Sequence, residues 1–165
     1  MVQLKYCPHC GGENSFSVID GRERFHCNSC KTIHYENPKP AATLICPKDK
    51  QLLLVRRAFE PAKGKWNLPG GFMECNETLE GAAARELLEE TQLHGTAVGL
   101  LGNCSHFDTL FGDVLLMGLE MKIDDWSTLE AGDDASEVGF FLLYDLPELA
   151  FTCHQKIVEI YRKKV

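Results

Sequence analysis

Two Cys-x-x-Cys pairs near the N-terminus constrain the fold of this chain more than any other feature. Cys7 and Cys10 form the first pair, Cys27 and Cys30 form the second, and sixteen residues separate the pairs. Two residues between thiolates let one tight turn direct both sulfur atoms at the same ion, and four thiolates complete a tetrahedral zinc site. Because such a site leaves no coordination position open, the pattern predicts a structural zinc ion rather than a catalytic one.

The segment around these cysteines is rich in Cys, His, Gly and Asn and poor in aliphatic residues. It cannot bury enough apolar surface to fold without the metal. A redox-active dithiol is the alternative, but it is typical of a helix start in a thioredoxin-like unit, which the sequence does not suggest. Pro38 and Pro40 favour an extended, stiff linker. We therefore expect a zinc ribbon at 1–37, with a structural or an interaction role, and a larger domain at 38–165.

The larger segment alternates strand-like and helix-like patterns. A helical pattern covers 79–91, and an amphipathic run begins near His154. Apolar runs predict strands at 41–46, 51–57, 97–103, 114–123 and 138–144. This mixture predicts an α+β fold.

Composition narrows the partners and the compartment. Acidic residues outnumber basic ones, 24 to 17, so the chain does not show the basic stripe of a nucleic-acid binder. The longest apolar runs fall well short of the roughly 18–20 residues that a membrane span requires, and the start has no apolar signal region. We expect a cytoplasmic protein with no membrane partner, because paired and scattered cysteines fit a metal site in a reducing compartment. The scattered ones are Cys46, Cys75, Cys104 and Cys153.

The stretch at 70–93, GGFMECNETLEGAAARELLEETQL, carries the candidate chemistry. Thr78 is a predicted N-cap, and helical spacing puts apolar side chains on one broad side: Ala83, Ala84, Leu87 and Leu88. A second stripe holds three carboxylates: Glu86, Glu89 and Glu90. Like charges at this spacing destabilise a helix by a few tenths of a kcal/mol per pair, which favours a bound cation. Carboxylates suit Mg²⁺ or Mn²⁺, although a solvated acidic face explains the triplet alone equally well.

The whole pattern resembles the signature of the Nudix hydrolases. It runs from Gly71 through Glu77 and Arg85-Glu86 to Glu89-Glu90 and Leu93, and flanking segments such as NPKPAATLI and GKWNLPGGF resemble members that carry an N-terminal zinc ribbon. Gln92 stands where the family usually has Gly. A non-Gly residue in a left-handed cap costs on the order of 1 kcal/mol, so we expect a local difference at the helix end and no loss of chemistry.

The resemblance implies a mixed sheet and helix sandwich that hydrolyses a nucleoside diphosphate linked to another moiety. Its Mg²⁺ or Mn²⁺ ligands would be Glu86, Glu89 and Glu90 with the backbone carbonyl of Gly70. Gly71, Glu77 and Arg85 would orient the site. A further catalytic carboxylate would follow the helix, with Glu137 favoured over Asp133 and Asp134; a surface charge is the alternative for Glu137. Arg56 and Arg57 are candidate phosphate-binding residues or edge charges. Aromatic candidates for nucleobase stacking, or simply for packing, are Trp66, Phe72, Phe107 and Phe111.

The segment after the signature bears on the substrate. NADH pyrophosphatases with a zinc ribbon carry a Ser-Gln-Pro-Trp-Pro-Phe-Pro run there, whereas this chain has HGTAVGLLGNCSHFDTLFGD at 94–113. The resemblance therefore favours ADP-ribose or FAD over NADH as the small-molecule substrate. The alternative is a non-catalytic nucleotide sensor with the ribbon as an interaction module, which the intact glutamates disfavour. RNA decapping, a third possibility, would require a basic channel for the RNA, which the composition does not indicate. A second copy of the chain, in a homodimer, is a further candidate partner.

Overall fold

The computed structural model describes residues 4–132 and 134–165 of the 165-residue chain. The chain divides between Pro38 and Lys39 into two compact units. In the described part, no helix is both long enough and apolar enough to cross a membrane.

The first unit is a small antiparallel sheet. Its three strands, in the order β1-β2-β3, are β1 (Asn14–Ile19), β2 (Arg22–Cys27) and β3 (Ile33–His34). Asp20 and Gly21 connect β1 to β2 with φ values of 51° and 75°, as the two-residue turn of a tight hairpin requires. The rings of Phe16 and Phe25 pack together with centroids 4.7 Å apart. So little apolar burial agrees with a unit that depends on a metal ion for its stability.

The second unit contains two sheets and two helices. The first sheet has the order β4-β9-β8, with β4 (Lys39–Ile45) parallel to β9 (Gly112–Lys122) and β8 (Thr96–Thr109) antiparallel to β9. The second sheet has the order β10-β6-β5, built from β5 (Pro47–Lys48), β6 (Gln51–Arg57) and β10 (Ala135–Leu142), and β7 (Trp66–Asn67) also pairs with β6.

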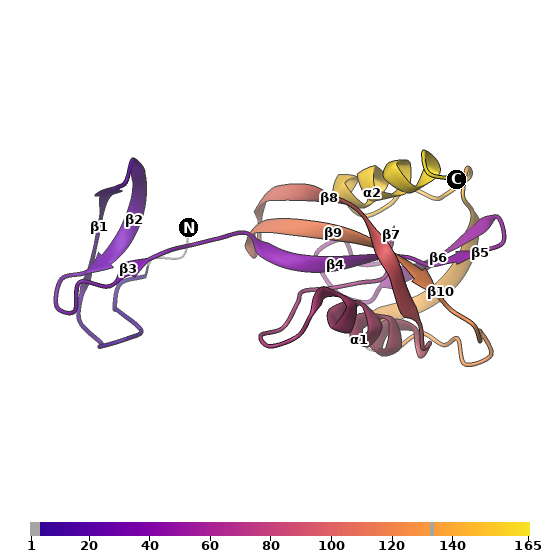
Figure 1. Cartoon of the computed structure of the whole chain (residues 1–165), viewed down its shortest axis with the longest axis horizontal. Coiled ribbons are helices and arrows are strands. Elements are labelled where there is room, and N and C mark those ends of the chain that lie inside the picture. Colours follow the sequence, from indigo (N-terminus) through magenta and orange to yellow (C-terminus); the bar gives the residue numbers. More distant parts are fainter. Residues whose placement is uncertain (1–3, 133) are drawn as a thin grey trace. The chain divides into compact units, whose positions relative to one another are not determined.

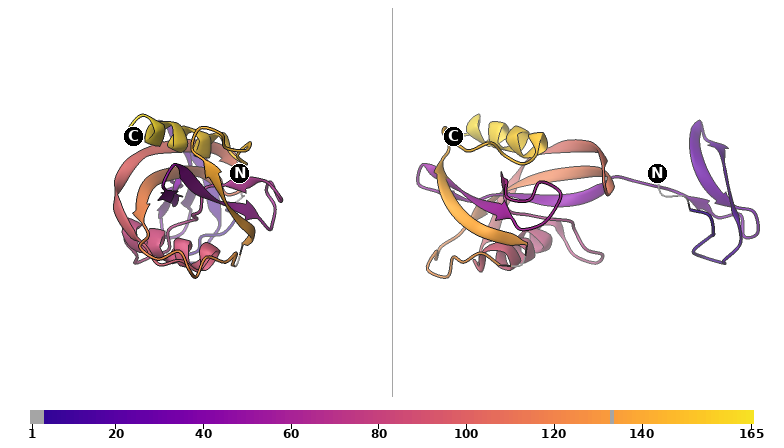
Figure 2. Two further views of the ribbon diagram at one scale, coloured as in Figure 1. Left: turned by 90° about the vertical axis from the view of Figure 1, so that its right-hand side faces the viewer. Right: turned by 180° about the vertical axis from the view of Figure 1, so that it is seen from behind.

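Helices α1 (Leu79–Thr91) and α2 (Thr152–Arg162) lie on opposite sides of these strands (Figures 1 and 2). The predicted α+β class is confirmed. Helix α1 has the predicted bounds, and α2 begins two residues before His154. Helical spacing groups Leu88 with the apolar residues of α1, but this residue is 36% exposed. The buried side instead includes Glu90, so a carboxylate lies where an apolar residue is normal.

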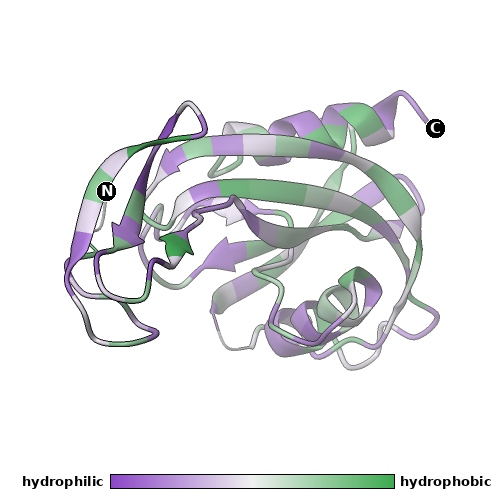
Figure 3. Cartoon of the chain, turned by 60° about the vertical axis from the view of Figure 1, so that its left-hand side comes forward, coloured by the Kyte–Doolittle hydropathy of each residue, from purple (hydrophilic) through white to green (hydrophobic). Residues whose placement is uncertain are grey.

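The pleat of the central strands divides the core into two clusters. Along β4, Ala41 and Ile45 belong to the cluster that contains α2 residues, whereas Ala42 and Leu44 belong to the cluster that contains α1 residues. Neighbouring side chains of a strand point to opposite faces, so a strand covered on both faces reads as an unbroken apolar run. In Figure 3 a central strand has hydrophobic colour along its length, whereas both helices have mixed colour.

Candidate active site

A glycine loop, residues 69–73, lies against β4 and leads toward α1. The N–H of Leu44 donates to Pro69 O at 2.8 Å, and the N–H of Ala42 donates to Gly71 O at 2.9 Å. Gly70 has a φ of 132°, and a Cβ atom there would lie 2.1 Å from the backbone oxygen of Ala42. Only glycine fits such a close approach of two backbones. The loop is therefore fixed in position by the strand.

Gly71 is a glycine for a different reason. A Cβ atom at this position would lie 2.6 Å from both carboxylate oxygens of Glu86. The missing side chain thus makes the space in which the Glu86 carboxylate rests against the loop.

Local capping interactions set both ends of α1. The predicted N-cap is confirmed, because Thr78 Oγ1 accepts a hydrogen bond from the N–H of Gly81 at 3.1 Å. At the other end Gln92 itself adopts the left-handed conformation, with φ 57° and ψ 18°, and its N–H donates to Leu88 O at 2.9 Å. Thr128 Oγ1 donates to Gln92 O at 2.8 Å. These contacts hold the left-handed cap without glycine, so the expected change at the helix end is absent.

Arg85 joins the glycine loop, the following turn and the helix. Its Nε and Nη2 donate to the two oxygens of Glu77 at 3.1 and 2.7 Å. Nη1 donates to Glu86 at 2.7 Å and to Glu89 at 2.9 Å, and Nη2 also donates to Phe72 O at 3.0 Å. The Arg85 guanidinium lowers the pKa of Glu77, and Glu77 foremost raises the pKa of Arg85. One cation therefore organises three carboxylates.

Glu90 is the most buried carboxylate of the helix, with a residue exposure of 9%. Its Oε2 accepts a hydrogen bond from the N–H of Gly70 at 2.9 Å. Burial chiefly raises the pKa of Glu90 to about 8, the charges of Glu86 and Asp134 add to the shift, and the Gly70 N–H and Arg57 oppose it. Burial also raises the pKa of Glu86, against the effect of Arg85. Crowded, desolvated carboxylates with raised pKa values are typical of functional sites.

These side chains face an acidic cavity of about 470 Å³. Its lining is Phe59, Glu86, Glu89, Glu90 and Asp134. The cavity has a size suited to a small-molecule ligand, and its donor set consists of hard carboxylate oxygens. A divalent cation fits this chemistry, because its positive charge would favour the ionised forms of Glu86 and Glu90, against the burial and the neighbouring carboxylates that raise their pKa values.

The N-terminal unit contains the predicted cysteine cluster. The Sγ atoms of Cys7, Cys10, Cys27 and Cys30 all lie within 4.8 Å of one another. The two pairs form equivalent turns, because the N–H groups of Gly11 and Lys31 donate to Cys7 O and Cys27 O at 2.8 and 3.1 Å. Gly11 and Lys31 both have positive φ, 74° and 64°. The Cys7–Cys30 Sγ separation of 3.8 Å matches the edge of a zinc–thiolate tetrahedron, which is about 3.8 Å for a Zn–S bond of about 2.3 Å.

Comparison with known proteins identifies both units. The family profile described as NUDIX domain matches residues 37–159, and the profile described as Nudix N-terminal, a zinc ribbon, matches residues 5–36. The chain belongs to the Nudix family. A Nudix hydrolase from Nitrosomonas europaea has a similar crystal structure, with a TM-score of 0.84 and 34% identity over 97% of this chain and 91% of that one.

Two of the curated Nudix relatives carry different names. The ADP-ribose pyrophosphatase of Methanocaldococcus jannaschii is 42% identical over 130 residues, which cover 78% of this chain and 76% of that protein. The NAD-capped RNA hydrolase NudC of Vibrio parahaemolyticus is 33% identical over 149 residues, which cover 90% of this chain and 55% of that protein. The chain thus spans about half the length of this second relative.

The two candidate phosphate-binding arginines of the Nudix domain make contacts within the protein. Arg56 Nε donates to Gly64 O at 2.7 Å, and Arg57 Nε donates to Pro61 O at 2.6 Å. Arg56 Nη1 also pairs with Glu137 Oε2 at 3.1 Å, because the two residues are partners in the β6–β10 register. Glu137 is thus engaged with an arginine, and of the described carboxylates after α1 it is Asp134 that lines the acidic cavity. Asp133 lies outside the described residues.

The aromatic candidates of the Nudix domain lie in different surroundings. Trp66 packs on Phe141 with centroids 4.8 Å apart and is partly buried against the core, and Phe72 packs on Phe111 at 5.4 Å. The aromatic residue that lines the acidic cavity is Phe59, which sequence reasoning missed. Its only signal was its place in a Pro- and Gly-bounded loop directly after the two arginines.

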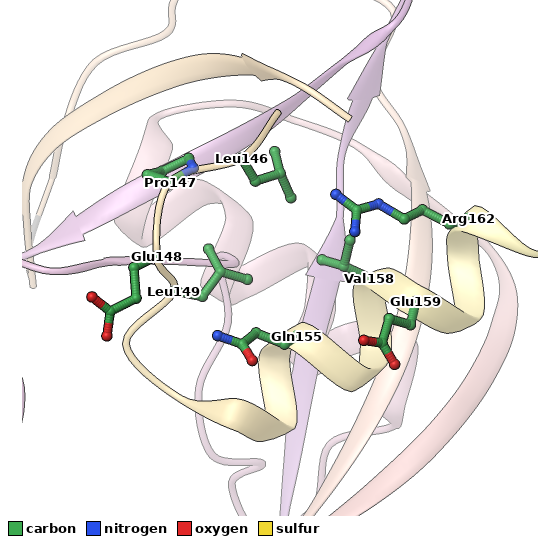
Figure 4. A pocket seen from close by; sticks show the side chains of 8 residues that line it. All are labelled: Leu146, Pro147, Glu148, Leu149, Gln155, Val158, Glu159 and Arg162. Atoms are coloured by element: carbon green, nitrogen blue, oxygen red, sulfur yellow. The ribbon is translucent and has the colours of Figure 1, made fainter. Parts of the chain in front are cut away.

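A second cavity of the Nudix domain, about 300 Å³ in volume, lies between α2 and the segment before it (Figure 4). Its floor is apolar, from Leu146, Leu149 and Val158, and its remaining lining is Pro147, Glu148, Gln155, Glu159 and Arg162. Arg162 Nε donates to Leu143 O at 2.9 Å, and Glu148 pairs with Lys65 at 3.1 Å. None of the signature residues lines it, so the acidic cavity remains the candidate active site.

Proposed function

We propose that this Nudix protein hydrolyses the pyrophosphate bond of a nucleoside diphosphate linked to another moiety, with ADP-ribose or FAD preferred to NADH. The acidic cavity carries the proposal, because four of its five lining residues are carboxylates, three of them on the signature helix. The name of the Methanocaldococcus jannaschii relative supports ADP-ribose. Hydrolysis adds water across the P–O–P linkage, so that one phosphorus gains a hydroxyl and the other phosphate leaves.

We assign the divalent-metal site to Glu86, Glu89 and Glu90, with the backbone carbonyl of Gly70 as a further ligand. When bound, Mg²⁺ or Mn²⁺ supplies charge neutralisation for the diphosphate and lowers the pKa of a coordinated water. The protein's part is to hold the carboxylates in position. The Gly70 N–H fixes Glu90, Arg85 holds Glu86 and Glu89, and Glu77 fixes Arg85. Gly71 provides the space for Glu86.

The additional catalytic carboxylate is assigned to Asp134 in preference to Glu137. Asp134 lines the cavity and its charge raises the pKa of Glu90, whereas Glu137 is paired with Arg56. Asp134→Asn should lower kcat at least tenfold, and Glu137→Gln should change it less than threefold. The opposite order of the two variants would return the role to Glu137.

The N-terminal unit is assigned a structural zinc ion. In this proposal residues 1–37 are the zinc ribbon and residues 38–165 are the catalytic domain. The closed four-thiolate set leaves no position for a substrate on the ion, so its contribution is to the folding of the ribbon.

The decisive experiment is a hydrolysis panel with millimolar Mg²⁺, covering ADP-ribose, FAD, NADH and dinucleoside polyphosphates. Wild-type protein is compared with Glu90→Gln, a nearly isosteric change that removes one negative charge from the site. We expect kcat to fall by several orders of magnitude on any accepted substrate, with the fold intact by circular dichroism. Asp49→Asn, in a turn with a left-handed φ of 55° that asparagine tolerates, is the matched control. A fall of less than about tenfold for Glu90→Gln would place the active site elsewhere.

Metal dependence has a separate test. Mg²⁺ or Mn²⁺ that binds only the folded protein raises its melting temperature by mass action. The zinc-loaded wild type should therefore melt at a higher temperature in millimolar Mg²⁺ than after removal of divalent ions from the buffer, and Glu90→Gln should show a smaller shift. Equal shifts in both proteins would exclude Glu90 as a ligand.

NAD-capped RNA is the second candidate substrate, because the Vibrio parahaemolyticus relative is named for its hydrolysis. The net charge of −7 favours a small molecule. Adding NAD-capped RNA to the panel separates the two, and binding of ADP-ribose without any hydrolysis would favour the alternative of a nucleotide sensor.

A further inference from the structure

We propose that Phe59 is a specificity-determining residue that stacks against a flat heterocyclic ring of the substrate, such as a nucleobase. The inference rests on the proposed function for the presence of a nucleotide. It concerns the group attached to the diphosphate, whereas the signature glutamates are assigned to the divalent metal.

The position of Phe59 carries the argument. Among the described residues that line the acidic cavity, Phe59 is the one apolar side chain, and the other four are carboxylates. Carboxylates with their cation attract phosphate oxygens, and they can accept hydrogen bonds from the edge of a neutral ring but offer no apolar surface to its face. Among the described residues that line this cavity, a ring next to the diphosphate therefore finds its one apolar partner in the side chain of Phe59.

The Phe59 loop, residues 58–65, is held in place at several points. The N–H of Ala58 donates to Asp134 O at 2.8 Å, which ties the residue before Phe59 to another residue that lines the cavity. Further backbone hydrogen bonds join Gly64 N to Arg57 O at 2.9 Å and Arg57 N to Lys65 O at 3.0 Å. A platform held in this way loses little conformational entropy when a ligand binds.

Arg56 and Arg57 brace the same loop. Their Nε groups donate to Gly64 O and Pro61 O, which fasten the C-terminal part and the middle of the loop to β6. The two arginines therefore act on ligand binding indirectly, because they hold the loop that positions Phe59. They are positioning residues in this inference.

Phe59 is 59% exposed, although full burial of a phenylalanine is worth about 1.5–3 kcal/mol. In the described part of the chain it belongs to neither core cluster. Stacking on an aromatic side chain tolerates any base, because every base has a π-face. Phe59 should thus favour substrates that contain a heterocyclic ring over those that do not, without selecting one base.

The test measures equilibrium binding in Mg²⁺ of two ligands that resist hydrolysis. One is ADP-ribose with a methylene bridge between its phosphorus atoms, and the other is methylenediphosphonate, which has no ring. Phe59→Ala should weaken binding of the first about tenfold and change binding of the second less than twofold. Phe59→Tyr should keep the affinity within threefold, and Phe59→Leu should behave as Phe59→Ala does. Tyr144→Ala, which removes an exposed ring that is not among the residues lining the cavity, is the control.

Each other outcome overturns the inference. Unchanged affinity of Phe59→Ala for the ADP-ribose analogue would exclude stacking, and equal losses for both ligands would mean that Phe59 shapes the phosphate site. Full affinity in Phe59→Leu would mean that apolar contact suffices without a ring. Absence of analogue binding to the wild type would also refute it. Wild-type protein that binds the analogue in the expected pattern but hydrolyses no substrate would refute the proposed function and leave the inference standing.

Discussion

Arg85 and Glu77 form a bidentate ion pair that joins helix α1 to the turn that follows the glycine loop. The Nε–Oε2 and Nη2–Oε1 distances are 3.1 and 2.7 Å, and the side chains are 29% and 18% exposed. Two parallel hydrogen bonds fix both the distance and the orientation of the guanidinium. The position of Glu77 therefore determines where the Arg85 guanidinium lies, and thus where it can bind the carboxylates of Glu86 and Glu89.

Replacing Arg85 should affect both stability and activity. Arg85→Ala leaves Glu77, Glu86 and Glu89 without this cation, and we expect a loss of about 2 kcal/mol in the free energy of unfolding. Arg85→Lys should recover less than half of this, because an ammonium cannot form the paired contact. Urea unfolding checks both variants. Lys65→Ala breaks an exposed ion pair with Glu148 and should cost less than about 1 kcal/mol.

The two loop glycines should respond differently to a methyl group. Gly70→Ala drives a Cβ atom into the Ala42 backbone and should cost at least about 3 kcal/mol of stability. Gly71→Ala meets the Glu86 carboxylate instead, which can rotate away, so stability should fall by less while kcat falls more than tenfold. Unfolding curves and initial rates measure the two effects. Gly99→Ala, where a Cβ atom meets nothing within 4 Å, should leave both unchanged.

Gln92 offers a stabilising change at the helix end. Because Gln92 holds a left-handed conformation with φ 57°, Gln92→Gly should raise the free energy of unfolding by about 0.5 kcal/mol. Gln92→Ala separates the backbone effect from the side-chain hydrogen bond to Leu88 O and should be neutral or slightly destabilising. Denaturant midpoints with unchanged slopes would report these differences. A destabilised glycine variant would show that the side chain of Gln92 matters more than its backbone.

Buried His154 should make stability depend on pH. Its Nδ1 accepts a hydrogen bond from the N–H of Leu68 at 3.2 Å, and burial chiefly lowers the His154 pKa from 6.5 to about 3, with Arg57 and His106 adding to the shift. Between about pH 6.5 and 3 the unfolded chain binds a proton at this position that the folded chain does not. The free energy of unfolding therefore falls as the pH decreases through this window.

His154→Gln keeps a hydrogen-bond acceptor and removes the titration. Between pH 7 and pH 5 its stability should fall by about 2 kcal/mol less than that of the wild type. Urea unfolding at the two pH values gives the comparison, with His94→Gln at an exposed position as the control. Parallel pH profiles for the wild type and His154→Gln would contradict a buried, neutral imidazole.

The cysteine cluster predicts one Zn²⁺ per chain. Cys27→Ser removes a buried ligand, and its zinc content should fall to less than a third of the wild-type value, as measured by elemental analysis of protein purified without chelator. Cys75→Ser changes an exposed cysteine outside the cluster and should retain the full content. Wild-type protein without zinc would refute the assignment.

Local interactions explain what could be predicted from the sequence. The two Cys-x-x-Cys turns, the Thr78 cap and the bounds of α1 depend on residues a few positions apart, so spacing and residue type were enough. The clustering of Glu86, Glu89 and Glu90 follows from the helical repeat alone. What a helix faces does not follow from its own repeat. The burial of Glu90 and the exposure of Leu88 depend on how α1 packs onto the rest of the domain.

The tertiary structure placed the rest of the cavity. Phe59 follows β6, and Asp134 precedes β10. These two strands are far apart in the chain but pair antiparallel, with Arg57 opposite Ala135, so that both residues line one cavity. The same register pairs Arg56, a candidate phosphate-binding residue, with Glu137, a candidate catalytic carboxylate. A shift of one residue in that register would exchange the faces of the strand. Strand register arises from packing of the whole core, and no local pattern in either strand specifies it.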